Sequence, residues 1–315
     1  MTVLLTALVV LLTVAIVALV TWEIVHRRSP LVRAWHPSTF PGRVGGGLGM
    51  LAGGAVSDRL RDDEPEAVVL LHGFGATADY FGDLYEGLGN SHRLVLPDLL
   101  GFGRSLDETR HTFSLADHVD AIEGALYSLG LGSSKVFLAA HSMGAAVALA
   151  WAGRHPDRVT GIALWAPPIY DTRRSDSDEL THELADRIGG VTRLLLSDEQ
   201  WAERMCRVSC ANRDVSGWLV ASAAPKWPVD VSRRAALHTW EAFDCSVNAL
   251  VLDVDWSTLF RVDASVTIFR GADDPVGDRE FTESVAGGAH IIDVEDADHH
   301  LPITHPNLLF DLLDA

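Results

Sequence analysis

The chain has 315 residues, of which 48% are hydrophobic and 22% are charged, and this composition excludes a disordered chain and a fibrous repeat. Its 25 basic and 43 acidic residues give a net charge of −18 with histidine neutral. Such an acidic surface repels phosphate backbones, so we expect no nucleic-acid partner.

The first element, residues 2–22, carries no charged side chain and consists almost entirely of Leu, Val, Ala, Ile and Thr. At ~1.5 Å per residue, a helix of this length matches the hydrocarbon core of a bilayer. Trp22 lies at its end, where interfacial aromatic residues are common. A cleaved signal peptide is the main alternative, but it needs a basic start, a shorter apolar run and a small-residue cleavage site. We therefore predict a transmembrane anchor over residues 2–26.

The flanks of this run predict its orientation. His26, Arg27, Arg28 and Arg33 follow the apolar run, and no basic side chain precedes it. Basic residues are retained on the cytoplasmic side of a membrane. We therefore predict a single-pass protein of the cell membrane with its remaining chain in the cytoplasm.

Residues 27–65 are rich in proline and glycine, and residues 45–49 read Gly-Gly-Gly-Leu-Gly. A phosphate-binding loop would need a strand before these glycines and a helix after them, and neither pattern is present. We predict a linker or irregular hairpin over residues 27–65.

From residue 66 onward, short apolar strand patterns alternate with helical patterns. The predicted strands are residues 68–72, 93–97, 135–140, 161–165, 265–270 and 290–294. The predicted helices are residues 78–88, 115–129, 143–154 and 306–313. Strands that are apolar on both faces and alternate with helices are typical of a parallel sheet covered on both sides. We predict an α/β fold whose mostly parallel central sheet is formed by residues 66–167 and 255–315.

Residues 168–254 interrupt this alternation. They contain no strand pattern, but they show helix-like periodicity and several tryptophans. We predict that they form a helical cap inserted into the α/β core. Cys206 and Cys210 are one helical turn apart in this insertion, and Cys245 stands alone. Three cysteines exclude a disulfide framework, and no further ligands stand at a suitable spacing, so we predict free thiols and no metal site.

The strand at residues 135–140 leads into Ser142 and then a helix. A sharp turn from a strand into a helix exposes a serine oxygen at the carboxyl edge of the sheet, which is the setting of a nucleophile elbow. The usual pattern is Gly-x-Ser-x-Gly, and this chain has Ala140 at the first position and Gly144 at the last. Alanine is small enough for such a turn.

This elbow and two further motifs make residues 66–315 similar to the α/β-hydrolase family. Residues 72–75 read His-Gly-Phe-Gly after the first predicted strand, and residues 98–105 read Asp-Leu-Leu-Gly-Phe-Gly-Arg-Ser. The resemblance implies that the backbone N–H groups of Phe74 and Met143 form an oxyanion hole, in which one donor typically lowers the barrier by about 3–4 kcal/mol. It also implies that Asp98 orders its loop.

The resemblance extends to the loops after the last two strands. Counting from Gly271 in the family's Gly-x-x-Asp pattern places the acid at Asp274, with Asp273 as the alternative. In the family, the histidine precedes a helix-starting proline by seven positions. This spacing selects His299, with His300 as the alternative.

The resemblance therefore implies a catalytic triad of Ser142, Asp274 and His299, in the chain order of this fold. His299 would exchange the proton of Ser142, and Asp274 would orient the imidazole. We expect a membrane-anchored serine hydrolase that cleaves an apolar ester or acyl substrate and needs no cofactor or metal. Family members that are dehalogenases or epoxide hydrolases use Asp at the elbow, where this chain has Ser142.

Other activities remain open at this stage. The same triad serves carbon–carbon bond hydrolases, thioesterases, acyltransferases and cofactor-free haloperoxidases, and the sequence does not separate them. An alternative outside the enzymes is a non-catalytic, membrane-tethered binding protein on a hydrolase scaffold.

Overall fold

The structure, a computed structural model, describes residues 2–53, 66–171 and 199–314, without the side chains of residues 2–10 and 199. Its strands are β1 (Gly42–Gly45), β2 (Leu48–Gly53), β3 (Ala67–Leu71), β4 (Arg93–Pro97), β5 (Val136–His141), β6 (Val159–Trp165), β7 (Val266–Gly271) and β8 (His290–Val294). The helices that flank the sheet are α3 (Leu115–Ser128), α4 (Gly144–Arg154), α11 (Trp256–Leu259), α12 (Arg279–Val285), α13 (Leu301–Thr304) and α14 (Asn307–Leu313). The remaining α-helices described are α1 (Thr2–Arg28), α2 (Pro30–Ala34), α7 (Glu199–Ala211), α8 (Arg213–Ala223), α9 (Val229–Arg234) and α10 (Trp240–Val247).

The described strands form one eight-stranded sheet in the order β1-β2-β4-β3-β5-β6-β7-β8. The strands from β3 to β8 pair in parallel, whereas β1 and β2 pair antiparallel with their neighbours. Each of the six predicted strands is present in this sheet. The prediction of a mostly parallel α/β sheet is therefore confirmed.

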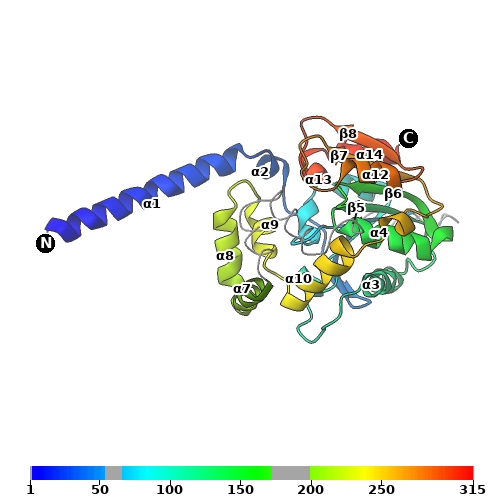
Figure 1. Cartoon of the computed structure of the whole chain (residues 1–315), viewed down its shortest axis with the longest axis horizontal. Helices are drawn as coiled ribbons and strands as arrows, with labels where there is room; N and C mark the ends of the chain where they lie inside the picture. Colours follow the sequence, from blue (N-terminus) through cyan, green and yellow to red (C-terminus); the bar gives the residue numbers. More distant parts are fainter. Residues whose placement is uncertain (1, 54–65, 172–198, 315) are drawn as a thin grey trace.

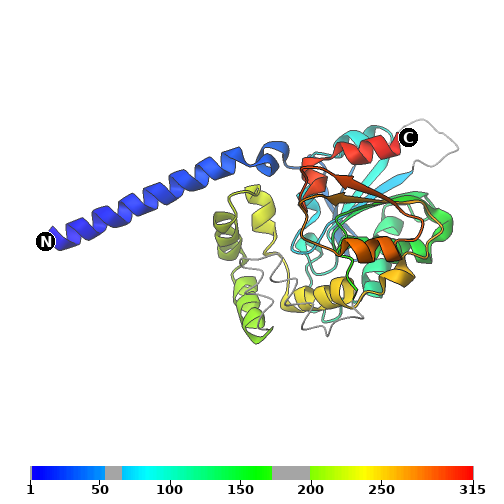
Figure 2. The same cartoon turned by 45° about the horizontal axis from the view of Figure 1, so that its top comes forward.

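The sheet separates two hydrophobic cores because successive side chains of a strand point to opposite faces. In β3, Val69 and Leu71 pack with α3 and α4, while Val68 and Leu70 pack on the other face with α14, and all four side chains are fully buried. Burial of each such side chain contributes roughly 1.5–3 kcal/mol. Figure 2 shows the sheet between α14 on one side and α12 on the other. The site residues that follow these strands therefore rest on a rigid base.

Part of residues 27–65, predicted to be a linker or irregular hairpin, belongs to the central sheet. Residues 42–53 form a hairpin, β1 and β2, and β2 extends the sheet by pairing with β4. The hairpin has a two-residue loop in which Gly46 and Gly47 have φ angles of 59° and 84°. Two positive φ angles match the right-handed twist of a hairpin, and glycine adopts them without a steric penalty. Residues 54–65 of the predicted linker lie outside the described residues.

A second difference concerns the helix predicted over residues 78–88. The structure has two short 3₁₀ turns there, Ala78–Phe81 and Glu86–Asn90. Gly82 separates them with a φ of 55°, and a Cβ at this position would lie 2.2 Å from the carbonyl oxygen of His36. The chain leaves the helical path here to pass close to the N-terminal segment.

Helices α7 to α10 lie within the insertion predicted as a cap, and residues 172–198 of that insertion lie outside the described residues. In Figure 1, α7, α8 and α9 lie beside the core, below the end of α1 that joins it. Helix α9 contacts the 3₁₀ turn Ala78–Phe81 of the core. Helix α9 therefore lies beside the segment that follows β3.

Helix α1 projects from the body of the protein and carries the N-terminus far from the sheet (Figure 1). At its base, a ring nitrogen of His26 lies 2.9 Å from the carbonyl oxygen of Pro225. The hydroxyl of Ser29 donates a hydrogen bond to the carbonyl oxygen of Lys226. The base of α1 is thus fixed to the chain that follows α8.

Among the described residues, the structure contains no helix that is both long and apolar enough to cross a membrane. The described side chains of α1 begin at residue 11 and include the charged groups of Glu23, Arg27 and Arg28. The structure therefore does not support the transmembrane anchor predicted over residues 2–26.

Candidate active site

Ser142 lies in the turn between β5 and α4. Its φ angle of 50° is in the left-handed region, which costs a non-glycine residue about 1–3 kcal/mol unless its surroundings hold it there. The backbone N–H of Ser142 donates a hydrogen bond of 2.9 Å to the carbonyl oxygen of Trp165. Two positions around this turn leave no room for a side chain. A Cβ on Gly73 would lie 2.9 Å from Cβ of Ser142, and one on Gly144 would lie 2.8 Å from the carbonyl oxygen of His72.

The structure brings together the three residues predicted to form a triad. Nε2 of His299 lies 3.0 Å from Oγ of Ser142, and Nδ1 lies 3.0 and 3.1 Å from the two carboxylate oxygens of Asp274. The Asp274 side chain is only 4% exposed, and its Oδ1 also accepts a hydrogen bond from the Val276 backbone N–H. An ionised carboxylate only accepts hydrogen bonds, so Nδ1 carries the proton and Nε2 can accept the proton of the serine.

The geometry distinguishes these residues from their neighbours. Asp273 is exposed and its backbone N–H donates to the carbonyl oxygen of Ala297. The His300 ring packs against other residues: its centroid lies 4.2 Å from that of Trp227, and its Nδ1 lies 3.5 Å from the hydroxyl of Tyr80. Burial, followed by the charge of the neighbouring His299, lowers the pKa of His300 to about 3. This ring is therefore neutral near pH 7.

Two backbone N–H groups were predicted to form an oxyanion hole. Met143 directly precedes α4, and Phe74 lies in the loop after β3. Neither N–H donates a hydrogen bond to another residue in the described part of the chain. His72 holds the Phe74 loop, because its Nδ1–H donates to the Gly73 carbonyl oxygen at 2.8 Å and its Nε2 accepts from the Leu99 N–H at 2.9 Å. Burial lowers the pKa of His72, which keeps this ring neutral.

Asp98 is fully buried and lies outside the triad. Its Oδ1 accepts a hydrogen bond of 2.5 Å from the Ala78 backbone N–H, and its Oδ2 accepts bonds of 2.7 and 3.1 Å from the backbone and guanidinium of Arg104. The guanidinium also binds Asp79 at 2.7 Å. These bonds order the loop, as the sequence predicted.

Sequence reasoning missed His141, which occupies the variable position of the elbow. Its side chain is buried, its Nε2–H donates a 2.8 Å hydrogen bond to the carbonyl oxygen of His299, and its ring stacks on Tyr80 at 4.9 Å. Burial lowers the pKa of His141 well below its ordinary value, and the neighbouring His299 and His300 add to this effect. A neutral His141 thus holds the backbone of His299. No local sequence signal indicates this contact, which joins residues 158 positions apart.

A cavity of about 530 Å³ opens onto Ser142 and His299, and most of its lining is apolar. Phe74 and Val276 line it from the core, and the region predicted as the cap contributes side chains that include Trp227. Cavities of roughly 300–1,000 Å³ commonly bury a small-molecule ligand. The arrangement therefore provides a serine oxygen, a proton acceptor and an apolar chamber.

Comparisons with known proteins agree with this architecture. Residues 66–193 match the family described as alpha/beta hydrolase fold. The protein named Probable lysophospholipase BODYGUARD 4 from Arabidopsis thaliana is 26% identical over 248 residues, which cover 73% of this chain and 58% of that protein. The chain thus spans less than two thirds of the length of this relative.

Two solved structures have similar folds. The structure of a membrane phospholipase A has a TM-score of 0.61 and 19% identity, covering 100% of this chain and 98% of that chain. An E-2-(acetamidomethylene)succinate hydrolase also has a TM-score of 0.61 and 19% identity, covering 88% of this chain and 100% of that chain. At these identities the likeness establishes the fold alone.

Proposed function

We propose that this chain, which has the α/β-hydrolase fold, is a serine hydrolase that cleaves a carboxylic ester through an acyl-enzyme on Ser142. The observation that carries the proposal is the continuous hydrogen-bond chain from Ser142 through His299 to Asp274, with distances of 3.0 Å at both steps. Nucleophile, base and orienting group are within the reach that this chemistry requires.

In the proposed reaction, His299 takes the proton of Ser142 as the serine oxygen attacks the ester carbonyl. Asp274 holds the imidazole in the reactive tautomer and stabilises the imidazolium. The backbone N–H groups of Phe74 and Met143 donate to the oxyanion of the tetrahedral intermediate. His299 then protonates the leaving alcohol. A water molecule activated by the same histidine releases the acid and restores the serine.

We infer an apolar, lipid-like acyl group for the substrate. The apolar lining of the cavity supports this, since apolar side chains such as Phe74, Val231 and Val251 surround the approach to Ser142. The name of the Arabidopsis relative, a probable lysophospholipase, is consistent with a substrate of this class.

We also propose that the N-terminal helix associates the protein with the cell membrane, with the hydrolase domain on the cytoplasmic side. The uncharged sequence of residues 2–22 and the exposed apolar side chains along α1, such as Leu11 at 68% and Leu19 at 68%, support this proposal. Arg28 and Lys226 are exposed near the base of α1, where basic groups would meet anionic headgroups.

Labelling with a fluorophosphonate tests the serine chemistry. Wild-type protein should be labelled at Ser142, and the Ser142→Ala variant should lose both labelling and turnover of p-nitrophenyl esters. A series of acyl chain lengths then measures the preference for apolar acyl groups. Robust ester turnover by Ser142→Ala would exclude the acyl-enzyme mechanism, and labelling without turnover of any ester would favour another acyl chemistry.

The adjacent residues provide matched controls for the triad. We expect His299→Ala and Asp274→Asn to lower kcat by about 10⁴-fold, because each removes a member of the hydrogen-bond chain. His300→Ala and Asp273→Asn should have much smaller effects on kcat. If the ranking is reversed in either pair, the assignment moves to the neighbouring residue.

Membrane association is tested by fractionation and protease protection in intact cells. The full-length chain should sediment with membranes and resist alkaline carbonate, and its hydrolase domain should be protected from external protease. A variant without residues 1–28 should be released while keeping its esterase activity, since the triad lies on the sheet. Digestion from outside would reverse the orientation, and a mature protein that lacks about 25 N-terminal residues would indicate a cleaved signal.

A further inference from the structure

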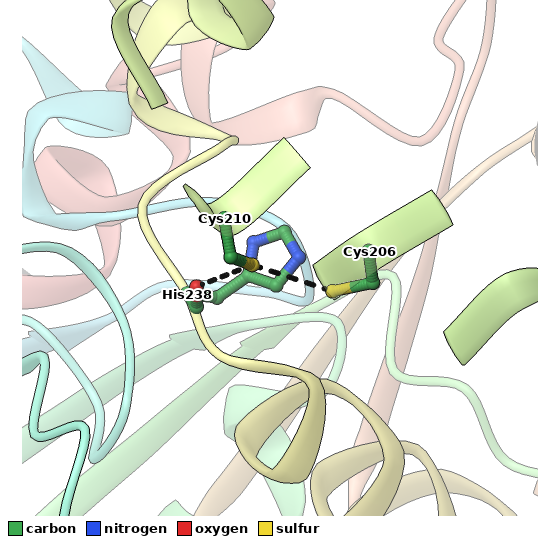
Figure 3. A group of neighbouring side chains, drawn as sticks. All are labelled: Cys206, Cys210 and His238. Carbon is green, nitrogen blue, oxygen red and sulfur yellow. Dashed lines mark hydrogen bonds between the residues drawn. The ribbon is translucent and has the colours of Figure 1, made fainter. Parts of the chain in front are cut away.

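A second group of chemically reactive side chains lies outside the cavity described above. Cys206 and Cys210 are one turn apart on α7, and His238 lies in the connection between α9 and α10 (Figure 3). One donor atom of each residue lies within 4.8 Å of the other two, and the two sulfur atoms are 3.5 Å apart. Cys206 is buried, and Cys210 and His238 are half-buried.

The hydrogen bonds of the group indicate which atoms can bind a ligand. Nδ1 of His238 lies 2.9 Å from the carbonyl oxygen of Ala235, so this nitrogen carries the proton and donates. The opposite nitrogen, Nε2, is then unprotonated, and its lone pair can accept a ligand. A metal-bound histidine commonly donates its other ring N–H to a backbone carbonyl in this way. The Cys210 thiol donates to the carbonyl oxygen of His238 at 2.9 Å, which holds the helix against the connection.

We propose that Cys206, Cys210 and His238 bind a Zn²⁺ ion through two thiolate sulfurs and one imidazole nitrogen. Zinc takes thiolate and imidazole ligands at about 2.3 and 2.0–2.1 Å in tetrahedral geometry. Those bond lengths require donor atoms about 3.5–3.8 Å apart, so the group closes around the ion with displacements of about 1 Å. The two thiols release their protons to solvent on binding. Water can complete the fourth position.

The place of the site in the fold suggests what the ion does. Phe102, in the loop ordered by Asp98, forms an isolated backbone bridge with His238, and the Gly103 N–H donates to the Leu237 carbonyl oxygen at 2.8 Å. A metal ion would therefore fasten α7 to the segment that joins the cap region to the core.

This joint lies close to the candidate active site. The ring of Phe243 lies 5.6 Å from that of His238 and 4.6 Å from that of Phe74, measured between centroids. Phe74 lines the cavity beside Ser142. The bound ion would thus stabilise the wall of the cavity without contacting substrate.

The test uses the full chain, reduced and freed of metal with a chelator, and titrated with Co²⁺ and then Zn²⁺. Thiolate ligands give Co²⁺ an intense sulfur-to-metal charge-transfer absorption, which Zn²⁺ should abolish at one ion per chain. Cys206→Ser, Cys210→Ser and His238→Gln should each weaken Zn²⁺ binding at least about tenfold. Cys245→Ser is the matched control, because Cys245 lies outside the group, and it should bind Zn²⁺ like wild type.

A thermal measurement gives an independent result, since an ion that binds only the folded chain raises its Tm. Zn²⁺ should raise the Tm of wild type and Cys245→Ser, and it should not raise that of the three variants of the group. The proposal is overturned if reduced wild type shows no charge-transfer absorption, or if binding survives in all three variants. The proposal is likewise overturned, in favour of a disulfide, if the protein before reduction is two mass units lighter at this pair of thiols and the reduced protein binds no Zn²⁺.

Discussion

Replacing Gly73 by alanine should displace Ser142 and lower the rate of the reaction, although none of the three triad residues is substituted. A Cβ at this position would lie 2.9 Å from Cβ of Ser142 and 2.9 Å from Nδ1 of His141. Normal contacts between such atoms are about 3.5–4.0 Å, so one side must move by roughly 0.5–1 Å. Both neighbours are buried, and the backbone turn holds Ser142 in place. The new methyl group therefore strains the elbow itself.

The expected magnitude follows from this displacement. A misplacement of about 1 Å can cost about 10²-fold in rate, which corresponds to roughly 2.7 kcal/mol of the barrier at 1.36 kcal/mol per tenfold change. Overpacking of a buried site typically lowers the free energy of unfolding by about 1–3 kcal/mol. Gly73→Ala should thus fold, melt somewhat lower, and lose about 10²-fold in kcat/KM for a p-nitrophenyl ester.

Gly153→Ala is the matched control. Gly153 lies in α4, the helix that follows Ser142, and a Cβ there meets no atom within 4 Å. Alanine in a helix is more favourable than glycine by about 0.5–1 kcal/mol, so this variant should keep full activity and melt at the same or a higher temperature. Wild-type kcat/KM in Gly73→Ala would refute the reasoning, because the methyl group would then fit without moving Ser142.

Two further predictions concern stability. Burial lowers the pKa of His118 to about 3, whereas a histidine in the unfolded chain titrates near 6.5. The contribution of the neutral His118 to the free energy of unfolding is therefore complete above pH ~6.5 and is lost progressively as the pH falls toward about 3. Urea unfolding from pH 7 to 5 should show a shallower loss of stability for His118→Leu than for wild type, and equal slopes would contradict this. Arg104→Met leaves the fully buried Asp98 without its cationic partner and should lower the free energy of unfolding by about 3 kcal/mol, whereas an unchanged Tm would show that the pair is dispensable.

The parts of the fold that the sequence predicted correctly are those with strong local patterns. Parallel strands covered on both faces are apolar throughout, and all six such runs from β3 to β8 are present. For residues 42–53 the sequence predicted only a linker or irregular hairpin, because the many glycines hide the strand pattern. What places β2 in the sheet is its pairing with β4, about 45 residues further along the chain, and no local pattern encodes that pairing.

The limits of sequence reasoning at the candidate sites have the same origin. The hydrogen bond from His141 to His299 and the approach of His238 to Cys206 both depend on long-range packing. Spacing along the chain predicts a thiol pair one turn apart, but it cannot show which histidine the folded chain brings to that pair. The side chains of the cavity wall, such as Trp227, come from a region without family motifs.

The glycine that begins the acid motif has a steric role that explains how Asp274 and His299 meet. Gly271 ends β7 and pairs with Val294 at the end of β8, so the two following loops start side by side at the same edge of the sheet. A Cβ on Gly271 would lie 2.3 Å from the carbonyl oxygen of Ala297, because the chain after β8 passes directly over this glycine. Through this close passage the second loop returns over the first, and His299 reaches both Asp274 and the serine that follows β5. The glycine three positions before the acid is therefore needed to position the triad, although it takes no part in the chemistry.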